Sequence, residues 1–255
     1  MGAVTGQVPE PLPGWLPAAR RITVLTGAGI STDSGIPDFR GPQGVWTRDP
    51  EAEKLSTLSW YVADPDVRRR AWQERLHHPA WSAEPNAGHA ALVELQRRGR
   101  LRALLTQNID GLHQAAGSAP ELVLELHGTV HEVGCLSCGD RTPMRAALDR
   151  VEAGEPDPAC ERCGGILKSA TISFGQALDA AVIDAAVAAA ADCDVFLAVG
   201  TSLTVHPAAG LVDLAAAHGA RVVVVNAQPT PYDATADLVV SEPIGTALPR
   251  LVADA

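Results

Sequence analysis

The hydrophobic positions of the chain fall into short, nearly continuous runs that are separated by stretches of helical character. Apolar runs of this length are typical of strands buried on both faces, and they predict strands at 22–25, 101–106, 122–126, 194–199, 221–226 and 237–240. The stretches between them predict helices over 86–99, 177–193 and 207–219. Strands that alternate with helices indicate an α/β fold with a parallel sheet and right-handed crossovers.

Two stretches interrupt this alternation. Residues 43–82 are rich in Trp and Arg, and residues 134–168 hold four of the five cysteines. We therefore predict that both stretches leave the sheet and together form a smaller domain. Ligands of a parallel sheet bind at the carboxyl ends of its strands, so the polar residues that follow each strand are the first candidates for a site.

Composition narrows the class of protein. A chain of 255 residues with 46% hydrophobic residues suits one large domain, or one large and one small domain. Its net charge of −10 disfavours nucleic-acid binding, which needs clustered Lys and Arg, and leaves room for a basic protein substrate. No run approaches the ~18 apolar residues of a membrane span, and the first residues match no signal-peptide or myristoylation pattern. These features predict a cytoplasmic protein.

Four cysteines form two pairs with C-x-x-C spacing, Cys135 with Cys138 and Cys160 with Cys163. Each pair can turn two thiolates toward one ion, and two pairs complete a tetrahedral Zn²⁺ site with bonds of ~2.3 Å. The 21 residues between the pairs exceed the usual ribbon spacing by one, and a helix in "PMRAALDRVEAG" is expected to fill them. Four thiolates leave no open coordination position, so we predict a structural metal, with free thiols or a redox pair as the alternative. We interpret Cys193 as a small structural residue.

The segment "TGAGISTDSGIPDFRG" at 26–41 starts as a nucleotide-binding turn but does not complete one. Gly27-Ala28-Gly29 follows a predicted strand, as in a turn that places a phosphate at a helix N-terminus. Thr32 stands where G-x-G-x-x-G has its third glycine, and no second strand carries the expected acidic residue. A polar loop with an Asp and an Arg follows instead, so the turn alone does not identify the ligand.

Polar residues also follow four other predicted strands. These ends carry Gln107, Asn108 and Asp110; His127; residues 200–202; and Asn226 with Ala227. Each one alone is explained by helix capping or packing. Because the carboxyl ends of parallel strands meet at one edge of a sheet, we predict that they converge with the turn at Gly27 on one ligand site.

These segments together resemble the sirtuins, the family of NAD-dependent protein deacylases. The resemblance rests on "GAGISTDSGIPDFRG", "TQNIDGLH", "ELHG", the two C-x-x-C pairs, "GTSL" followed by His206-Pro207, and Asn226, in the family's order. It spans residues 22 to 230. It implies a Rossmann-like NAD-binding domain of residues 1–42, 83–133 and 171–255, with a small helical and zinc-ribbon domain of residues 43–82 and 134–170 inserted into it.

The resemblance implies that NAD lies inverted and extended across the larger domain. The turn at Gly27 would approach the phosphates, the loop with Phe39 would cover the nicotinamide ribose, and Asn108 and Asp110 would line the nicotinamide pocket. Phe39 would shield the reactive carbon after nicotinamide leaves. The implied cofactor contacts are Gly27, Ala28, Gly29, Asp38, Phe39, Arg40, Gln107, Asn108, Asp110, Gly200, Thr201, Ser202, Asn226 and Ile244.

The resemblance also implies a mechanism. The amide oxygen of an acyl-lysine would attack the ribose C1′ as nicotinamide departs, and His127 would then act as general base on a ribose hydroxyl. An imidazole suits this role because its ordinary pKa lies near the working pH. The implied catalytic residues are His127, Asn108 and Asp110. The products are free lysine, nicotinamide and an acyl-ADP-ribose, and zinc takes no part.

The acyl-lysine peptide is implied to bind a monomeric enzyme as a β-strand between the two domains. The matching stretch is Ile172 to Gly175, with Ile172, Phe174 and Gly175 as its contacts. The chain departs from the family here, because Ser169 stands in place of a proline and Gln176 in place of an acid. We expect the backbone contacts to survive, so the departure bears on substrate sequence preference.

One pair bears on the acyl group that is removed. Sirtuins that prefer succinyl- or malonyl-lysine carry a Tyr-x-x-Arg pair whose Arg meets the acyl carboxylate. The nearest match is Trp72 with Arg75, which stands almost as far before Pro85-Asn86-Ala87 as the Tyr-x-x-Arg pair does in those sirtuins. The indole N–H of Trp72 would have to replace the Tyr hydroxyl as hydrogen-bond donor. The alternative is a Trp and an Arg on the surface of a helix. We expect deacetylation, with removal of acidic acyl groups secondary.

Other functions fit the same residues. A mono-ADP-ribosyltransferase or NAD glycohydrolase would pass ADP-ribose to a side chain or water, and it would release nicotinamide without an acyl-peptide. A silent module that binds NAD or acyl-lysine would release no nicotinamide, but the joint presence of His127, Asn108 and Asp110 argues against it. A zinc-ribbon nucleic-acid adaptor is disfavoured by the net charge of −10.

Overall fold

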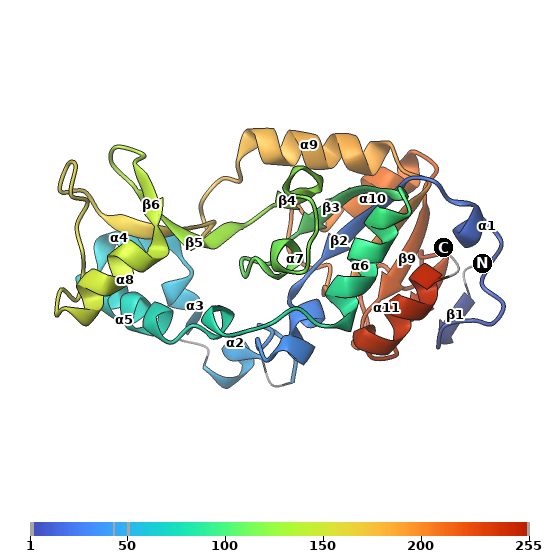
Figure 1. The fold of residues 1–255 in the computed structure, drawn as a ribbon, viewed down its shortest axis with the longest axis horizontal. Helices are drawn as coiled ribbons and strands as arrows, with labels where there is room; N and C mark the ends of the chain where they lie inside the picture. The colour runs from blue at the N-terminus through green and yellow to red at the C-terminus, as the bar shows by residue number, and fades with distance from the viewer. Residues whose placement is uncertain (1–2, 43, 50–51, 254–255) are drawn as a thin grey trace.

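The computed structural model describes residues 3–42, 44–49 and 52–253 and is built on a seven-stranded parallel sheet with the order β1-β10-β9-β8-β2-β3-β4 (Figure 1). Its strands are Ala3–Gly6 (β1), Ile22–Thr26 (β2), Leu101–Thr106 (β3), Val123–Glu125 (β4), Val195–Val199 (β8), Arg221–Val225 (β9) and Leu238–Val240 (β10). The six predicted strands are confirmed. Strand β1 was not predicted, because "AVTG" is too short and too polar to stand out, and it adds to the edge of the sheet beside β10.

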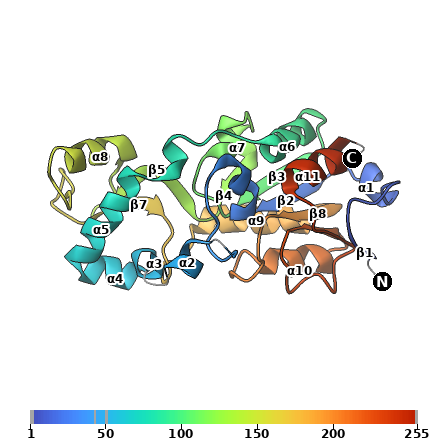
Figure 2. The ribbon, with the colours of Figure 1, turned by 90° about the horizontal axis from the view of Figure 1, so that it is seen from below.

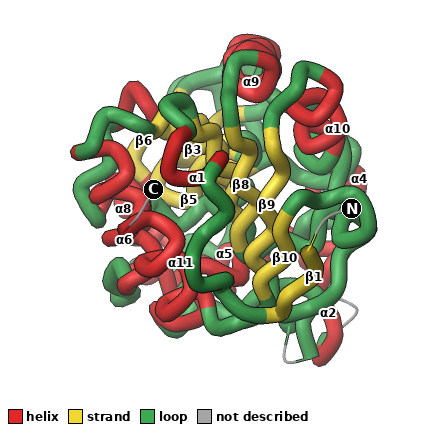
Figure 3. The backbone as a smooth tube through the Cα atoms, turned by 90° about the vertical axis from the view of Figure 1, so that its right-hand side faces the viewer, coloured by secondary structure: helices red, strands yellow, loops and turns green. Residues whose placement is uncertain are grey.

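Helices cover both faces of this sheet, as Figure 3 shows. Helices α9 (Ala180–Ala191) and α10 (Gly210–Ala217) pack on one face, while α6 (Ala87–Arg97) and α11 (Ile244–Ala253) pack on the other. Side chains alternate across each strand, so Val24 joins one core and Leu25 the other. The predicted helix over 207–219 begins only at Gly210, because residues 206–209 form a turn.

A second lobe lies to one side of the sheet (Figure 2) and contains a three-stranded antiparallel sheet of order β6-β5-β7. The strands are Gly128–Cys135 (β5), Arg141–Pro143 (β6) and Leu167–Thr171 (β7), and the helices are Val45–Arg48 (α2), Ala52–Leu55 (α3), Leu58–Ala63 (α4), Pro65–Leu76 (α5) and Met144–Glu152 (α8). Helix α8 confirms the helix predicted between the cysteine pairs. Residues 1–2, 43, 50–51 and 254–255, which fall within the predicted domain ranges, lie outside the described residues.

The remaining elements are short. They are Trp15–Ala18 (α1), Ala28–Ser34 (η1), Pro79–Trp81 (η2), Leu112–Ala115 (α7) and Pro120–Leu122 (η3). Within the described ranges, no helix has the length and apolar character needed to cross a bilayer.

The strand order reverses at β2, and this reversal positions the site. Strand β2 lies between β3 and β8, with Thr26 opposite Thr106 on one side and Val199 on the other. The chain therefore leaves three adjacent strands at the same level, at Gly27, Gln107 and Gly200. A reversal of this kind opens a crevice at the carboxyl edge, where such folds bind their ligands.

Candidate functional site

The turn after β2 is packed tightly against the turn after β8. A Cβ atom on Gly27 would lie 2.7 Å from the carbonyl oxygen of Gly200, and one on Gly29 would lie 2.7 Å from the Cα of Gly200. The predicted reason for these glycines was close approach of a phosphate, and the structure adds the packing of two loops as a second requirement. Thr32, which replaces the third glycine, donates its hydroxyl to the Gly29 carbonyl at 2.9 Å and so closes the turn.

A buried polar cluster stands beside this turn. The Nδ2 atom of Asn108 donates to the Gly27 carbonyl and to Ser31 Oγ, both at 3.2 Å, and the Ser31 hydroxyl donates to Asp110 Oδ2 at 2.7 Å. Asp110 also accepts from the Leu112 backbone N–H at 3.0 Å. Ser31 has no exposed surface and was missed in the sequence, although it lies within the most informative segment. Ser31 lies four residues after Gly27, and both accept from Asn108 Nδ2, a relation that appears only once β2 and β3 are side by side.

His127 is oriented by the backbone that follows β3. Its Nδ1 lies 3.0 Å from the carbonyl oxygen of Gln107. Burial lowers the pKa of His127, and the bond to the Gln107 carbonyl opposes that shift only in part. Gly128 sets the direction of the chain here, since its φ is +69° and a Cβ would lie 2.0 Å from the Ala170 carbonyl oxygen. The His127 carbonyl then accepts from Ile172 N–H at 2.8 Å, which joins His127 to the predicted peptide stretch.

Polar groups at the ends of β8 and β9 extend the site along the sheet edge. Gln107 Nε2 donates to Thr201 Oγ1 at 2.9 Å, and Ser202 Oγ lies 2.8 Å from Thr204 Oγ1. Asn226, at the end of β9, donates to the Gln228 carbonyl at 2.7 Å. Ile244 begins α11 and is half-buried against the core. The residues after β2, β3, β8 and β9 are therefore brought to one edge, as the strand pattern predicted.

The loop with Asp38, Phe39 and Arg40 is joined to the peptide stretch by aromatic contacts. The Phe39 ring lies 4.7 Å from the Trp46 ring, which in turn lies 5.5 Å from Phe174, measured between centroids. The Arg40 guanidinium sits 4.5 Å from the Trp46 centroid, and Asp38 Oδ1 accepts from Gly41 N–H at 3.0 Å. Trp46 was not predicted as part of the site. Its place between two predicted residues makes it the bridge from the loop to the second lobe.

One side of the predicted peptide stretch is already paired with the chain itself. Phe174 forms a parallel bridge with Thr57, in which Phe174 N–H donates to the Ser56 carbonyl at 2.8 Å and its carbonyl accepts from Leu58 N–H at 3.0 Å. Backbone groups of successive residues in an extended chain point to opposite sides. On the opposite side, Ser173 N–H donates to Gln176 Oε1 at 3.3 Å and the Ser173 carbonyl accepts from Gln176 N–H at 3.0 Å, so a bound strand would have to replace these local bonds.

Trp72 is buried and Arg75 is half-buried. Trp72 has no exposed surface, and its ring packs in the second lobe's core with Val133, Met144 and Leu148. The Arg75 guanidinium donates to Ser169 Oγ at 2.8 Å and to the Ala71 carbonyl at 2.9 Å, and burial lowers its pKa. Ser169, the residue that departs from the family pattern, is thus the partner of Arg75.

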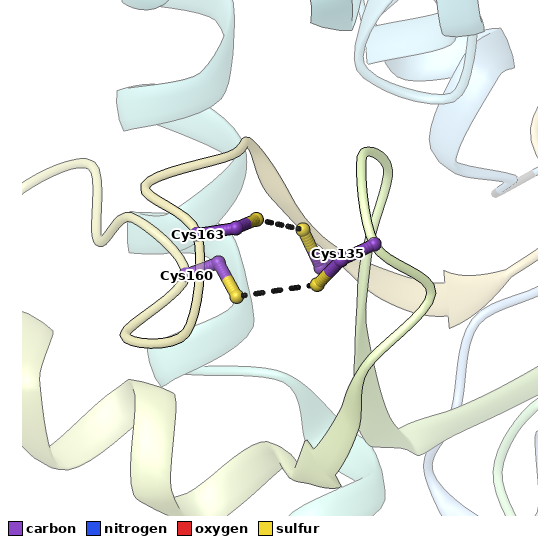
Figure 4. Close-up of side chains that lie close together, drawn as sticks. Cys135, Cys160 and Cys163 are labelled. Carbon is purple, nitrogen blue, oxygen red and sulfur yellow. Dashed lines mark hydrogen bonds between the residues drawn. The ribbon is translucent and has the colours of Figure 1, made fainter.

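The four cysteines meet as predicted, from two loops that face each other (Figure 4). All four sulfur atoms lie within 4.8 Å of one another, with Cys135 and Cys163 at 3.5 Å and Cys138 and Cys160 at 3.8 Å. Sulfurs at the corners of a tetrahedral ZnS₄ centre have comparable separations, so the cluster fits a structural zinc ion. Cys193 is buried beneath α9 and donates to the Ala190 carbonyl at 3.3 Å, far from this cluster in the fold.

Comparison with known proteins agrees with this site. The model of the Sir2 family matches residues 27–207. NAD-dependent protein deacetylase 2 of Streptomyces coelicolor is 58% identical over 231 residues, which cover 91% of this chain and 96% of that protein. An NAD-dependent protein deacylase of Ralstonia nicotianae is 43% identical and covers 94% of each chain.

Solved structures show the same likeness in three dimensions. A Sir2 enzyme with a p53 peptide and NAD⁺ superposes with a TM-score of 0.83 at 32% identity, covering 94% of this chain and 95% of the other. A Sir2 protein bound to an acetylated peptide gives a TM-score of 0.83 at 30% identity, with the same coverage. A third Sir2 structure reaches 0.84 at 38% identity and covers 94% of each chain.

Proposed function

Because the chain belongs to the Sir2 family and is an NAD-dependent protein deacetylase or deacylase, we propose that His127 is its general base and that the reaction runs at the carboxyl edge of the parallel sheet. The contact between His127 Nδ1 and the Gln107 carbonyl, at 3.0 Å, carries this proposal. A carbonyl only accepts, so Nδ1 holds the proton and Nε2 presents a lone pair. Burial lowers the pKa of His127, which keeps this base-competent form dominant at neutral pH.

The proton taken by His127 comes from a ribose hydroxyl of NAD. In the proposed sequence the acyl-lysine amide oxygen bonds to the ribose C1′ as nicotinamide leaves, and the activated hydroxyl then adds to the carbon of the resulting imidate. Water completes the release of lysine and leaves the acyl group on ADP-ribose. His127 Nε2 holds the proton between these steps, as a positioned general base should.

The other predicted residues are assigned to parts of NAD. Asn108 and Asp110, held by Ser31, form the nicotinamide pocket, and the turn at Gly27 receives the phosphates. The loop residues Asp38, Phe39 and Arg40 cover the nicotinamide ribose, and the Phe39–Trp46 contact at 4.7 Å gives that loop a support on the second lobe. Contacts to the rest of NAD are assigned to Ala28, Gly29, Gln107, Gly200, Thr201, Ser202, Asn226 and Ile244.

The acyl-lysine substrate is proposed to bind as an extended strand along the stretch from Ile172 to Gly175, on the side where Ser173 would exchange its local bonds to Gln176 for bonds to the strand. Segment 56–58 occupies the other side through both backbone groups of Phe174. The strand would then lie between the sheet domain, residues 1–42, 83–133 and 171–255, and the small domain, residues 43–82 and 134–170. A monomer suffices for this arrangement, since every proposed contact comes from one chain.

We assign acetyl-lysine as the preferred substrate. Trp72 is enclosed in the small-domain core, so its indole offers no surface to an acyl group in this structure. The Arg75 guanidinium already donates to Ser169 and Ala71, and a carboxylate would have to displace the Ser169 contact. Removal of succinyl groups should therefore be slower than removal of acetyl groups, and Arg75→Met should lower only the succinyl rate.

Product analysis tests the reaction itself. The protein is incubated with NAD alone and with one peptide carrying acetyl-, propionyl- or succinyl-lysine, and nicotinamide and acyl-ADP-ribose are quantified by mass spectrometry. We expect nicotinamide release to require an acyl-peptide and to match acyl-ADP-ribose in amount. Nicotinamide release that ignores the peptide would instead identify an ADP-ribosyltransferase or NAD glycohydrolase.

A further inference from the structure

Two buried histidines lie behind the cluster of Asn108, Ser31 and Asp110, and the reaction described above gives them no role. His89 on α6 is fully buried, His113 on α7 is 1% exposed, and their ring centroids lie 4.9 Å apart. Among the described residues, neither His89 Nε2 nor His113 Nδ1 has a hydrogen-bond partner. Buried polar atoms without partners are rare in folded proteins and call for an explanation.

Their other ring nitrogens determine where the protons sit. The Asn86 backbone N–H can only donate, so His89 Nδ1 accepts it at 3.2 Å and the neutral His89 ring carries its proton on Nε2. Thr26 donates its hydroxyl to Thr106 Oγ1 at 2.9 Å, and therefore accepts at 2.9 Å from His113 Nε2. His113 is left with a lone pair on Nδ1.

The two unpartnered atoms are therefore one donor and one acceptor on neighbouring rings. Both rings are neutral near pH 7, because burial, with a contribution from His89, lowers the pKa of His113 to about 3 and burial lowers the pKa of His89. The ring centroids are 4.9 Å apart and the χ2 torsion of histidine is broad, so ring rotation is the motion that would pair this donor with this acceptor.

We propose that His89 Nε2–H donates to His113 Nδ1 and completes a buried hydrogen-bond chain that positions Asn108 in the nicotinamide pocket. The chain continues from His113 through Thr26 to Thr106, whose Oγ1 also accepts from the Asn108 backbone N–H at 3.0 Å. His89, His113, Thr26 and Thr106 are thus positioning residues that touch neither NAD nor peptide. The inference rests on the proposed role of Asn108.

Both ends of this hydrogen-bond chain contact the same segment, η1. At one end Asn86 Nδ2 donates to the Ile30 carbonyl at 2.8 Å and to Ser34 Oγ at 2.9 Å. At the other end Asn108 Nδ2 donates to Gly27 and Ser31. This series of hydrogen bonds therefore fixes Asn108 relative to both ends of η1. Loss of one of these bonds should weaken NAD binding while leaving the peptide contacts near Phe174 in place.

A matched pair of substitutions on β2 tests this. Thr26→Val removes the hydroxyl that joins His113 to Thr106. Thr23→Val removes an equally buried hydroxyl from the same strand, one that donates to the Ala189 carbonyl on the opposite face at 2.8 Å. We expect Thr26→Val to raise KM for NAD about tenfold, the effect of one lost buried hydrogen bond, with kcat and peptide KM within about twofold. Thr23→Val should lower Tm similarly without changing KM for NAD.

The ring protons supply a second, independent readout. Nitrogen-15 spectra of the wild-type protein should show His89 and His113 as neutral Nε2–H tautomers from about pH 6 to about pH 8, and Thr26→Val should release His113 into a tautomer mixture. A charged or Nδ1-protonated His113 in the wild type, or an equal rise in KM for NAD in both valine variants, would overturn the proposal. The Kd for NAD, measured by titration without peptide, should rise in Thr26→Val as KM does, and a failure of His127 as base would leave this binding result unaffected.

Discussion

The edge of the parallel sheet and the cysteine-bearing lobe are held in shape by different means. At the sheet edge, Asn108, Ser31 and Asp110 are buried and joined by hydrogen bonds of 2.7 to 3.2 Å, on top of two large hydrophobic cores. In the lobe, a small core around Trp72 lies next to four sulfurs within 4.8 Å of one another. Single substitutions at the sheet edge should therefore remove catalytic activity while the fold remains. Loss of the metal should instead unfold the whole cysteine-bearing lobe.

Removal of the metal should give the largest difference in behaviour between the two regions. We expect one zinc ion per chain, and we expect chelation or Cys160→Ser to unfold the small lobe and to abolish activity, because zinc binding by four thiolates contributes on the order of 10 kcal/mol to folding. Metal analysis, circular dichroism and activity provide the measurement. Cys193→Ala is the control, since Cys193 is buried elsewhere and should keep both zinc and activity. A well-folded, active preparation without zinc would contradict this expectation.

Replacing His127 should produce the opposite pattern. His127→Ala is expected to lower kcat by about 10²-fold or more while thermal stability and NAD binding stay close to wild type, because a positioned base contributes to the rate and little to the core. His218→Ala, at the exposed end of α10, should change neither quantity. Near-normal turnover by the His127 variant would rule out the general-base assignment.

A substitution next to the base tests how precisely the backbone must hold it. In Gly128→Ala the new Cβ would lie 2.0 Å from the Ala170 carbonyl oxygen, so β5 and β7 must move apart and His127 must shift. We expect roughly a tenfold loss of kcat/KM together with a lower Tm, since a left-handed non-glycine residue alone costs about 1–3 kcal/mol. Gly154→Ala is the matched control, because Gly154 also has a positive φ but nothing within 4 Å of its Cβ position. Equal activity loss in both variants would refute the positional argument.

The pH dependence gives the smallest effect. A general base works in its deprotonated form, so activity falls as pH drops through the folded-state pKa of His127, which burial places below the ordinary 6.5. The rate should therefore decline toward acidic pH with a midpoint below 6.5. Profiles of kcat for the wild type and for His218→Ala should coincide. A midpoint above 6.5 would show that His127 is not held in the neutral state that its burial indicates.

Much of this arrangement was predictable because it depends on local patterns. Continuous apolar runs identified six of the seven strands, and two C-x-x-C pairs identified the metal cluster before any contact was known. The placement of His127 and Asn108 after strands was enough to predict a shared edge. Strand β1 escaped prediction because four residues carry too little periodicity, and Trp46 because nothing local distinguishes it from the other tryptophans.

The sequence by itself determined the α/β class, the four-cysteine cluster, the family and the residues that line up along the sheet edge, because spacing and hydrophobic periodicity encode them within short segments. Only the tertiary structure decided that Trp72 is enclosed in a core, that Phe174 already pairs with segment 56–58, and that Thr26 meets both Thr106 and His113. These contacts join residues far apart in the chain, and they depend on strand register and on which face each side chain takes. A change of one residue in register would reverse those faces, which is why no local pattern reveals them.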